Sequence, residues 1–424
     1  MFLNLIFNRL TNTDALKLAS GKFEIYFFEF MYRVIYFFGI SVSDKSVKYW
    51  LYSVVVKTLL MLLAVGEVWN FCTMTWTIEG ITDGINVIFI QICALCKYKV
   101  LITNKKVFNE LASSMESKNF DLSTKERKKI VDIWRKRNET WLKLLLAIGT
   151  STVIAWHIYP LMDDMEYNLM VSIRLPFNYK TPSLYPITYI CTLIVFSYMS
   201  YFVMTNDLIV QAHLMHILCQ FAVLKDSFKN ILTDCSSDFK GRVAMFIKLI
   251  KNYELSNNNY DINLGCTKLF GNIGDITKRI ILTFICSNTL KLRDLISTPM
   301  LIHLATSTTL ILIILLMDVN MTKGLMSLFY LAYNMFVLYI ICRWCEEIKI
   351  QSEKIGEAVY FSGWENGIVK IPGVRNTILL ILARANNPAG LSAGGMYDLS
   401  LEPALRSPTR LPSVVTMGKT RQDT

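Results

Sequence analysis

The sequence LYPITYICTLIVFSYMSYFVM, residues 184–204, is a run of apolar, aromatic and small polar residues without a single charge. A helix needs about 20 such residues to cross the roughly 30 Å hydrocarbon core of a bilayer. The sequence that follows, DLIVQAHLMHILCQFAVLKDSFKNIL (207–232), keeps apolar side chains at helical spacing but includes charged ones. Together the two stretches predict a membrane-spanning helix that continues beyond the membrane and packs there in a cytoplasmic helical layer.

Five further stretches have the length and apolar character of membrane crossings: 50–69, 81–102, 141–160, 299–317 and 324–342. The stretch 81–102 is the weakest because Asp83 and Lys97 shorten it. The whole chain is 53% hydrophobic and 18% charged, whereas soluble domains carry roughly 25% charged residues. The sequence therefore predicts an all-α, polytopic membrane helical bundle with six crossings.

Basic residues indicate the orientation of these crossings. Residues 97–140 hold twelve basic and six acidic residues, whereas the loop 161–182 holds two basic and three acidic ones. The loop between the first two crossings has Glu79 and no basic residue. Cytoplasmic loops are enriched in Lys and Arg, so the N-terminus and the segment 205–298 are expected to be cytoplasmic. The net charge of +11 therefore indicates membrane orientation, and we expect no nucleic acid partner.

Residues 23–40, FEIYFFEFMYRVIYFFGI, form a different kind of apolar segment. Glu24, Glu29 and Arg33 make this segment too polar for a stable crossing, so we interpret it as an interfacial amphipathic helix. The predicted organisation has six parts: a cytoplasmic N-terminus with this helix (1–47), crossings one to four (48–204), a cytoplasmic helical extension (205–298), crossings five and six (299–342), a cytoplasmic helix with the segment after it (343–402), and a polar tail (403–424).

Several common motifs of enzymes are absent from the sequence. It has no phosphate-binding P-loop, dinucleotide fingerprint or H-E-x-x-H helix, so we predict that the protein is not an enzyme and has no cofactor. Three pairs have spacings found in metal sites: His213 with His216, Cys93 with Cys96, and Cys342 with Cys345. Both cysteine pairs lie in or beside apolar runs, where cysteine packs as a small apolar residue. We interpret these residues as structural and expect no metal.

Aromatic residues gather at the outer ends of three predicted crossings. Rings in such positions commonly form an apolar pocket for a small ligand, although an interfacial aromatic belt is the alternative for any single ring. Carriers usually show broken helices, inverted repeats or intramembrane charges, and this chain shows none of these clearly. We expect the ligand pocket in the region of Trp156, Tyr159, Tyr185, Tyr189, Phe329, Tyr330 and Tyr333.

Four stretches of the chain resemble insect odorant receptors. The first, RLPFNYKTPSLYPITYI (174–190), is similar to the family's loop into the fourth helix, and NDLIVQAHLMHILCQFAVLKDSF (206–228) is similar to the extension of that helix. The stretches EKIGEAVYFSGW (353–364) and ILARANNPAGLSAGGMYDLSLE (381–402) resemble the family's C-terminal signature, the most specific part. The resemblance covers roughly residues 30 to 402. Hydropathy alone would also fit a gustatory-type receptor.

The resemblance implies a seven-helix receptor with a cytoplasmic N-terminus. It further implies a ligand-gated cation channel subunit in the plasma membrane of sensory neurons, acting in olfactory signalling. Such a subunit forms a hetero-tetramer with an odorant co-receptor subunit and binds a small apolar volatile in the outer part of the bundle. The family's last helix lines the pore.

Residues 403–424 depart from this family pattern. The stretch AGGMYDLSLE (393–402) matches the start of the family's seventh helix, but Pro403, Pro408 and Pro412 follow, with four basic residues and one acidic residue. Proline inside a helix costs about 3 kcal/mol, and a charged residue in the bilayer centre adds several more. The tail therefore cannot cross a membrane, and we expect six crossings where the family has seven.

Two alternatives from other classes stay open at this point. A membrane carrier would show ligand-dependent uptake without channel-like current. A product of a shifted reading frame or an unspliced intron would have no function as written. An apolar segment of about 20 residues in another frame beyond the codon of Glu402 would support that last alternative.

Overall fold

The computed structural model of the chain describes residues 22–39, 47–74, 78–113, 124–162, 166–230, 284–316 and 321–362, with residues 379, 382, 392–393 and 397–398. Helices account for nearly all of this part of the chain. They are α3 (Lys22–Phe37), α4 (Val47–Thr73), α5 (Ile78–Thr103), α6 (Lys105–Ser113), α7 (Lys125–Met162), α8 (Tyr185–Lys229), α11 (Phe284–Leu316) and α12 (Met321–Tyr360). The expected all-α bundle is therefore confirmed for the described residues.

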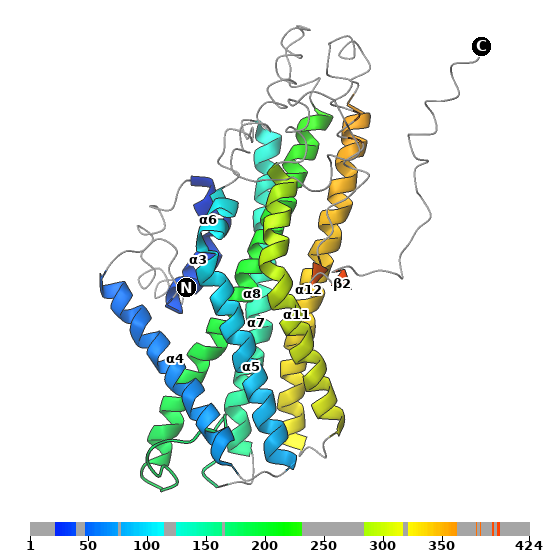
Figure 1. Ribbon diagram of the computed structural model, residues 1–424. Coiled ribbons are helices and arrows are strands. Elements are labelled where there is room, and N and C mark those ends of the chain that lie inside the picture. The colour runs from blue at the N-terminus through cyan, green and yellow to red at the C-terminus, as the bar shows by residue number, and fades with distance from the viewer. Residues whose placement is uncertain are drawn as a thin grey trace, which may run out of the picture.

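Helix α8 is the centre of the bundle (Figure 1). It contacts α3, α4, α5, α6, α7, α11 and α12, which are all the other helices that the structure describes. Its 45 residues make it about 68 Å long at 1.5 Å per residue, roughly twice the thickness of the hydrocarbon core. The continuation of this helix past residue 204, expected from the helical spacing of apolar residues, is confirmed.

Four of the described helices are long and apolar enough to cross a membrane: α4, α7, α8 and α12. They contain four of the six stretches expected to cross. The remaining stretches, 81–102 and 299–317, fall largely on α5 and α11, which contact each other. A total of six crossings remains a prediction.

The first half of α7 is stabilised by charge pairs along its surface. Asp132 forms ion pairs with Arg135 and Lys136, and Glu139 forms them with Arg135 and Lys143, all at three- or four-residue spacing. Such pairs join successive helical turns and favour a helix that water surrounds. Hydrogen bonds from Tyr26, and from Lys136 and Arg135, lower the pKa of Asp132. This polar half precedes the apolar stretch 141–160, so one helix joins a charged segment to one that is long and apolar enough to cross a membrane.

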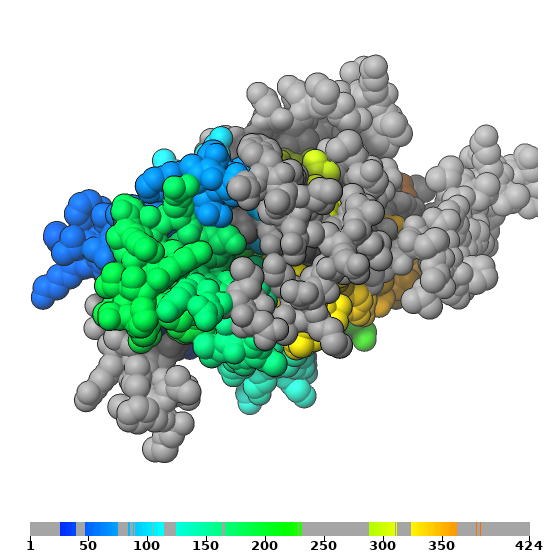
Figure 2. Space-filling view, turned by 90° about the horizontal axis from the view of Figure 1, so that it is seen from below, coloured from blue at the N-terminus to red at the C-terminus, as the bar shows by residue number. Residues whose placement is uncertain are grey.

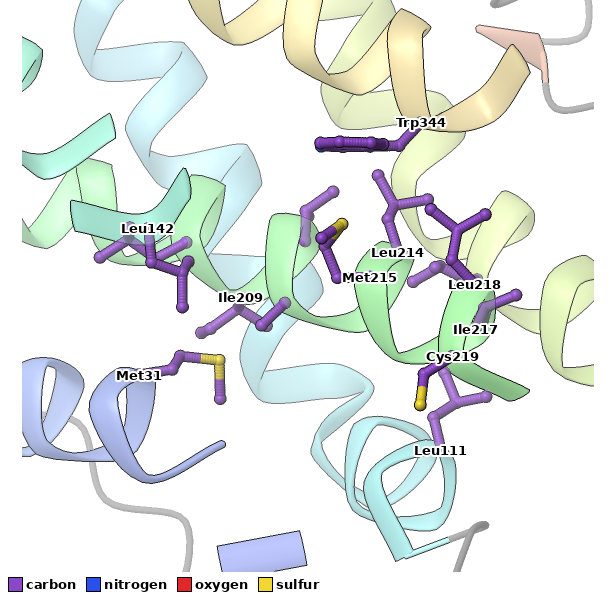
Figure 3. Packing of buried hydrophobic residues seen from close by; sticks show 14 of the residues in the cluster. Met31, Leu111, Leu142, Ile209, Leu214, Met215, Ile217, Leu218, Cys219 and Trp344 are labelled. Carbon is purple, nitrogen blue, oxygen red and sulfur yellow. The ribbon is translucent and has the colours of Figure 1, made fainter. Parts of the chain in front are cut away.

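The main hydrophobic core lies where α3, α6, α7, α8, α11 and α12 meet. Figure 3 shows labelled side chains of α3, α6, α7 and α12 beside those of α8. Leu142 of α7, Leu111 of α6 and Trp344 of α12 are almost completely buried there. The charged half of α7 and the extension of α8 are thus parts of one packed body with the apolar helices.

Helix α3 corresponds to the segment expected to be an interfacial amphipathic helix. One face of it packs against α8, with Phe28 and Met31 almost fully buried, and the Tyr26 hydroxyl donates to Asp132 Oδ1 at 2.7 Å. The segment is helical and amphipathic, and its apolar face contacts protein. Whether its other face lies at a membrane interface remains a prediction.

His213 and His216, whose spacing would suit a metal pair, are core residues of α8. The His216 ring packs beside Phe27 and Phe28, with ring centroids 5.2 and 5.1 Å away, and its Nδ1 lies 3.3 Å from Gln220 Nε2. Groups of three or more potential metal ligands do not occur among the described residues. Burial lowers the pKa of His216 to about 3, because the core disfavours the imidazolium form.

We expect this histidine to make the protein less stable in acid. Between pH 6.5 and about 3 the unfolded chain binds a proton at His216 that the folded protein does not bind. The contribution is therefore complete above pH 6.5 and is lost, at up to about 1.4 kcal/mol per pH unit, as the pH falls. Thermal unfolding of detergent-solubilised protein at about pH 7.5 and 5.5 measures this loss. His216→Gln should reduce the difference between the two midpoints, and an unchanged difference would contradict the assignment.

A short antiparallel strand pair follows the helices. Strand β1 (Ser392–Ala393) contacts α11 and pairs with β2 (Tyr397–Asp398). The resemblance implies that a seventh helix starts here, so the strand at Tyr397–Asp398 differs from that expectation. Gly394, Gly395 and Met396 separate the strands in sequence, and three-residue connections that contain glycine are common between paired strands. The tail, 403–424, lies outside the described residues.

Candidate ligand-binding site

The loop between α7 and α8 caps one end of the bundle. Leu169, Val171 and Ile173 of this loop pack with Leu63 of α4 into a second apolar cluster, separate from the main core. The backbone N–H of Arg174 donates to the carbonyl of Gly66 at 3.1 Å, which ties the loop to α4. Seen from this end in Figure 2, the green atoms of the loop and of the start of α8 make up much of the coloured surface.

A cavity of about 90 Å³ lies between this loop and the bundle core. That volume is several times the 10–15 Å³ or so that one water molecule requires. Apolar and aromatic side chains dominate its wall. The lining residues are Glu67 of α4, Ile90 and Gln91 of α5, Thr152, Val153 and Trp156 of α7, Val171 of the loop, Phe196, Met199, Ser200, Val203 and Met204 of α8, and Tyr330 and Tyr333 of α12.

Gly149 lets α7 approach α8 and α12 beside this cavity. A Cβ at this position would lie 2.5 Å from Met204 Sδ and 3.2 Å from Tyr333 Cε2, and both of those residues line the cavity. Any side chain at residue 149 would therefore displace Met204. The small residue sets the spacing of three helices at the cavity wall.

Three of the seven aromatic residues expected at a pocket line this cavity: Trp156, Tyr330 and Tyr333. The Trp156 ring packs against that of Phe196, with centroids 5.3 Å apart. Tyr333 is buried, and its hydroxyl donates to Asp207 Oδ2 at 3.0 Å. These rings come from α7 and α12, which both contact α8.

The other four lie outside the cavity wall. The Tyr185 hydroxyl donates to the carbonyl of Asn168 at 2.6 Å, and the Tyr189 hydroxyl donates to that of His157 at 2.7 Å. Tyr159 is buried and accepts from Asn168 Nδ2 at 3.4 Å. Tyr185 and Tyr159 thus join the loop to α8 and α7, and Tyr189 joins α8 to α7. Phe329 is 40% exposed on the surface of α12.

Two polar residues of the cavity wall were not expected. Glu67 is 5% exposed, and Gln91 Nε2 donates a hydrogen bond to its Oε2, which links α4 to α5. The signal in the sequence was an acidic residue within the apolar stretch 50–69, because such residues are rare in crossings and are usually functional. Its partner 24 residues away could not be read from one sequence.

A buried ion pair lies next to the cavity. Lys97 Nζ of α5 is 2.6 Å from Asp207 Oδ1 of α8, and both side chains are at most 3% exposed. Tyr333, which lines the cavity, donates to the other carboxylate oxygen. Lys97, which shortens the apolar stretch 81–102, is therefore buried and paired, and its position relative to the membrane remains a prediction. The pair and the tyrosine connect three helices through polar contacts.

Solved structures with the same fold are insect olfactory receptors. The olfactory receptor OR5 from Machilis hrabei matches with a TM-score of 0.65 and 14% identity, over 88% of this chain and 92% of that chain. The same receptor in complex with eugenol matches with a TM-score of 0.65 and 15% identity, over 90% and 94%. A comparison with curated proteins finds no significant match.

A comparison of the sequence with family models identifies the family of the chain. The family model described as 7tm odorant receptor matches residues 77–404, a range that runs from α5 to β2. The match ends two residues after Glu402, close to the position at which the sequence departs from the family pattern. The chain therefore belongs to the insect odorant receptor family and is a receptor rather than an enzyme.

Proposed function

We propose that this odorant receptor binds a small volatile molecule in the cavity between α4, α5, α7, α8 and α12, and that binding is read out as a cation current when a membrane-spanning seventh helix completes the chain. The observation that carries the proposal is the cavity itself, walled by Trp156, Phe196, Tyr330 and Tyr333 beneath the capping loop. Pockets for small ligands are usually concave and mostly apolar, with a few polar groups that fix orientation. This cavity has that composition.

The proposed assembly is a hetero-tetramer with an odorant co-receptor subunit, in the plasma membrane of sensory neurons. We further propose six crossings and a cytoplasmic N-terminus. The charge distribution supports this orientation, because the basic first half of α7 and the long extensions of α8, α11 and α12 then share the cytoplasmic side. In this arrangement the cavity lies in the outer part of the bundle.

The solved complex of the related receptor suggests a ligand of suitable size. That receptor has been determined with eugenol, a small phenol, and its fold matches this chain over most of both lengths. A cavity dominated by aromatic walls suits a molecule that has one ring and a short side chain. We therefore take eugenol as the first probe for this cavity.

Tyr333 provides a physical connection between ligand and helix arrangement. Its ring lines the cavity, and its hydroxyl contacts the Lys97–Asp207 pair, which joins α5 to α8. A ligand shifts a closed-to-open equilibrium only through its different affinities for the two states. A ligand that moves the Tyr333 ring changes the contacts of this pair. It can therefore bind with different affinities to the closed and open states.

Replacing Trp156 should test the site. We expect Trp156→Ala to weaken eugenol binding about tenfold, because the ligand loses an aromatic wall worth about 1–2 kcal/mol. The measurement is the eugenol-dependent rise in the unfolding midpoint of purified receptor, which follows the ligand concentration relative to Kd.

Trp50→Ala is the matched control, since Trp50 lies 64% exposed on α4, away from the cavity. It should leave the eugenol response within about twofold of the unaltered receptor. Equal losses in both variants would refute the assignment of the cavity, and no stabilisation of the unaltered receptor would refute eugenol as its ligand.

A further inference from the structure

Glu67 is an unusual component of an apolar cavity wall. The side chain is almost completely buried, and Gln91 supplies its one hydrogen bond within the part of the chain that the structure describes. Cationic side chains within ion-pair distance of Glu67 do not occur among those same residues. A carboxylate in such surroundings is costly unless a cation or several donors meet it. The Glu67 carboxylate in the cavity wall can therefore accept more hydrogen bonds than the described residues donate to it.

The rest of the wall suits an organic cation. The side chains of Trp156, Phe196, Tyr330 and Tyr333 line the same cavity. Aromatic faces attract ammonium groups, most strongly where water is excluded. The hydroxyl of Tyr333 is already bonded to Asp207, so the ring is the part that this residue contributes to the cavity. An acid together with several rings is the combination that recognises amines.

The neighbouring charges do not oppose a cation. Lys97 is near the cavity because its partner Asp207 accepts a hydrogen bond from Tyr333 of the cavity wall. Lys97 Nζ is 2.6 Å from Asp207 Oδ1, so the pair has no net charge. The capping loop contributes Arg174, which is exposed and lies over the Trp69 ring at 5.9 Å. Glu67 therefore dominates the electrostatic potential inside the cavity.

We propose that the cavity is selective for a small volatile amine, whose ammonium group pairs with Glu67 while its hydrocarbon part lies among the aromatic rings. This proposal rests on the proposed function and names the chemical class of its ligand. Alkylamines are protonated near pH 7, since their basicity resembles that of the lysine side chain. Gln91 then orients the carboxylate by donating to one of its oxygens.

Three probes of one skeleton test this selectivity: phenethylamine, phenethyl alcohol and ethylbenzene. They differ only at the end of the side chain, which is ammonium, hydroxyl or hydrogen. Binding to the purified full chain is measured near pH 7 by the rise in unfolding midpoint. We expect the amine to bind at least about tenfold more tightly than the alcohol.

The key variant is Glu67→Gln, which keeps the shape of the side chain and its hydrogen bond with Gln91. We expect it to remove the preference for the amine while the alcohol stays within about twofold of its original affinity. Glu110→Gln is the matched control, because this carboxylate is exposed on α6 and does not line the cavity, and it should keep the preference for the amine.

The possible outcomes separate this proposal from the function on which it rests. If the alcohol and ethylbenzene bind as tightly as the amine, or if Glu67→Gln retains the preference, then the amine assignment is wrong and the odorant cavity stands. If none of the three probes nor eugenol binds, the cavity is not a ligand site and both proposals fail.

Discussion

Lys97→Met is expected to lower the free energy of unfolding by about 3–5 kcal/mol, a larger loss than we expect from any other single substitution in this receptor. The substitution leaves the buried Asp207 carboxylate without its cation, 2.6 Å from the place where the ammonium was. A buried charge without a counter-ion is strongly destabilising, because the one remaining hydrogen bond from Tyr333 does not compensate for the lost hydration of the carboxylate. Thermal unfolding of the detergent-solubilised receptor measures the effect.

The double variant Lys97→Met with Asp207→Asn separates the cost of an unpaired charge from the net value of the pair. Replacing both partners by uncharged groups is often nearly neutral, so we expect the double variant to recover more than half of the loss. The asparagine also retains an acceptor for the Tyr333 hydroxyl. Lys99→Met is the control, because Lys99 is exposed on the same helix. Equal destabilisation by Lys97→Met and Lys99→Met would show that the pair is unimportant.

This ion pair also marks the limit of inference from one sequence. The periodicity of α8 predicted a single helix through the membrane and beyond it, because apolar spacing depends only on local sequence. Contacts between helices depend on residues that are far apart in the sequence. Lys97 and Asp207 are 110 residues apart, and a lysine near the end of an apolar stretch was interpreted as a limit of the crossing.

The aromatic residues illustrate the same limit within the candidate site. The enrichment at the outer ends of three predicted crossings indicated a region whose Trp156, Tyr330 and Tyr333 line the cavity, and that this cavity binds a ligand stays a prediction. The sequence alone could not distinguish these residues from Tyr185 and Tyr189. The hydroxyls of those two tyrosines donate to backbone carbonyls of distant residues, and such contacts cannot be predicted from one sequence. Amphipathic spacing identifies which side of a helix is apolar. It does not identify which group on another helix each side chain meets.

The tail is expected to decide whether the receptor produces current. In cells that also express a co-receptor subunit, we expect no volatile-evoked current from the chain with its present residues 403–424. Three prolines and four basic residues in 22 positions prevent this segment from forming a membrane-spanning helix, because each proline removes a backbone hydrogen bond that lipid cannot replace. A current evoked in such cells would refute this expectation directly.

A replacement of the tail gives the complementary result. Exchanging residues 403–424 for an apolar, aromatic-bearing helix of about 20 residues from another family member should produce a volatile-evoked current where there was none. A shuffled version of the present tail is the matched control and should stay silent. Eugenol binding should be the same in all three chains, because the described residues that line the cavity belong to α4, α5, α7, α8, α12 and the capping loop, which the exchange leaves unchanged. Binding and conduction would then be separable, with the ligand site complete in the described helices and the pore dependent on the segment after Glu402.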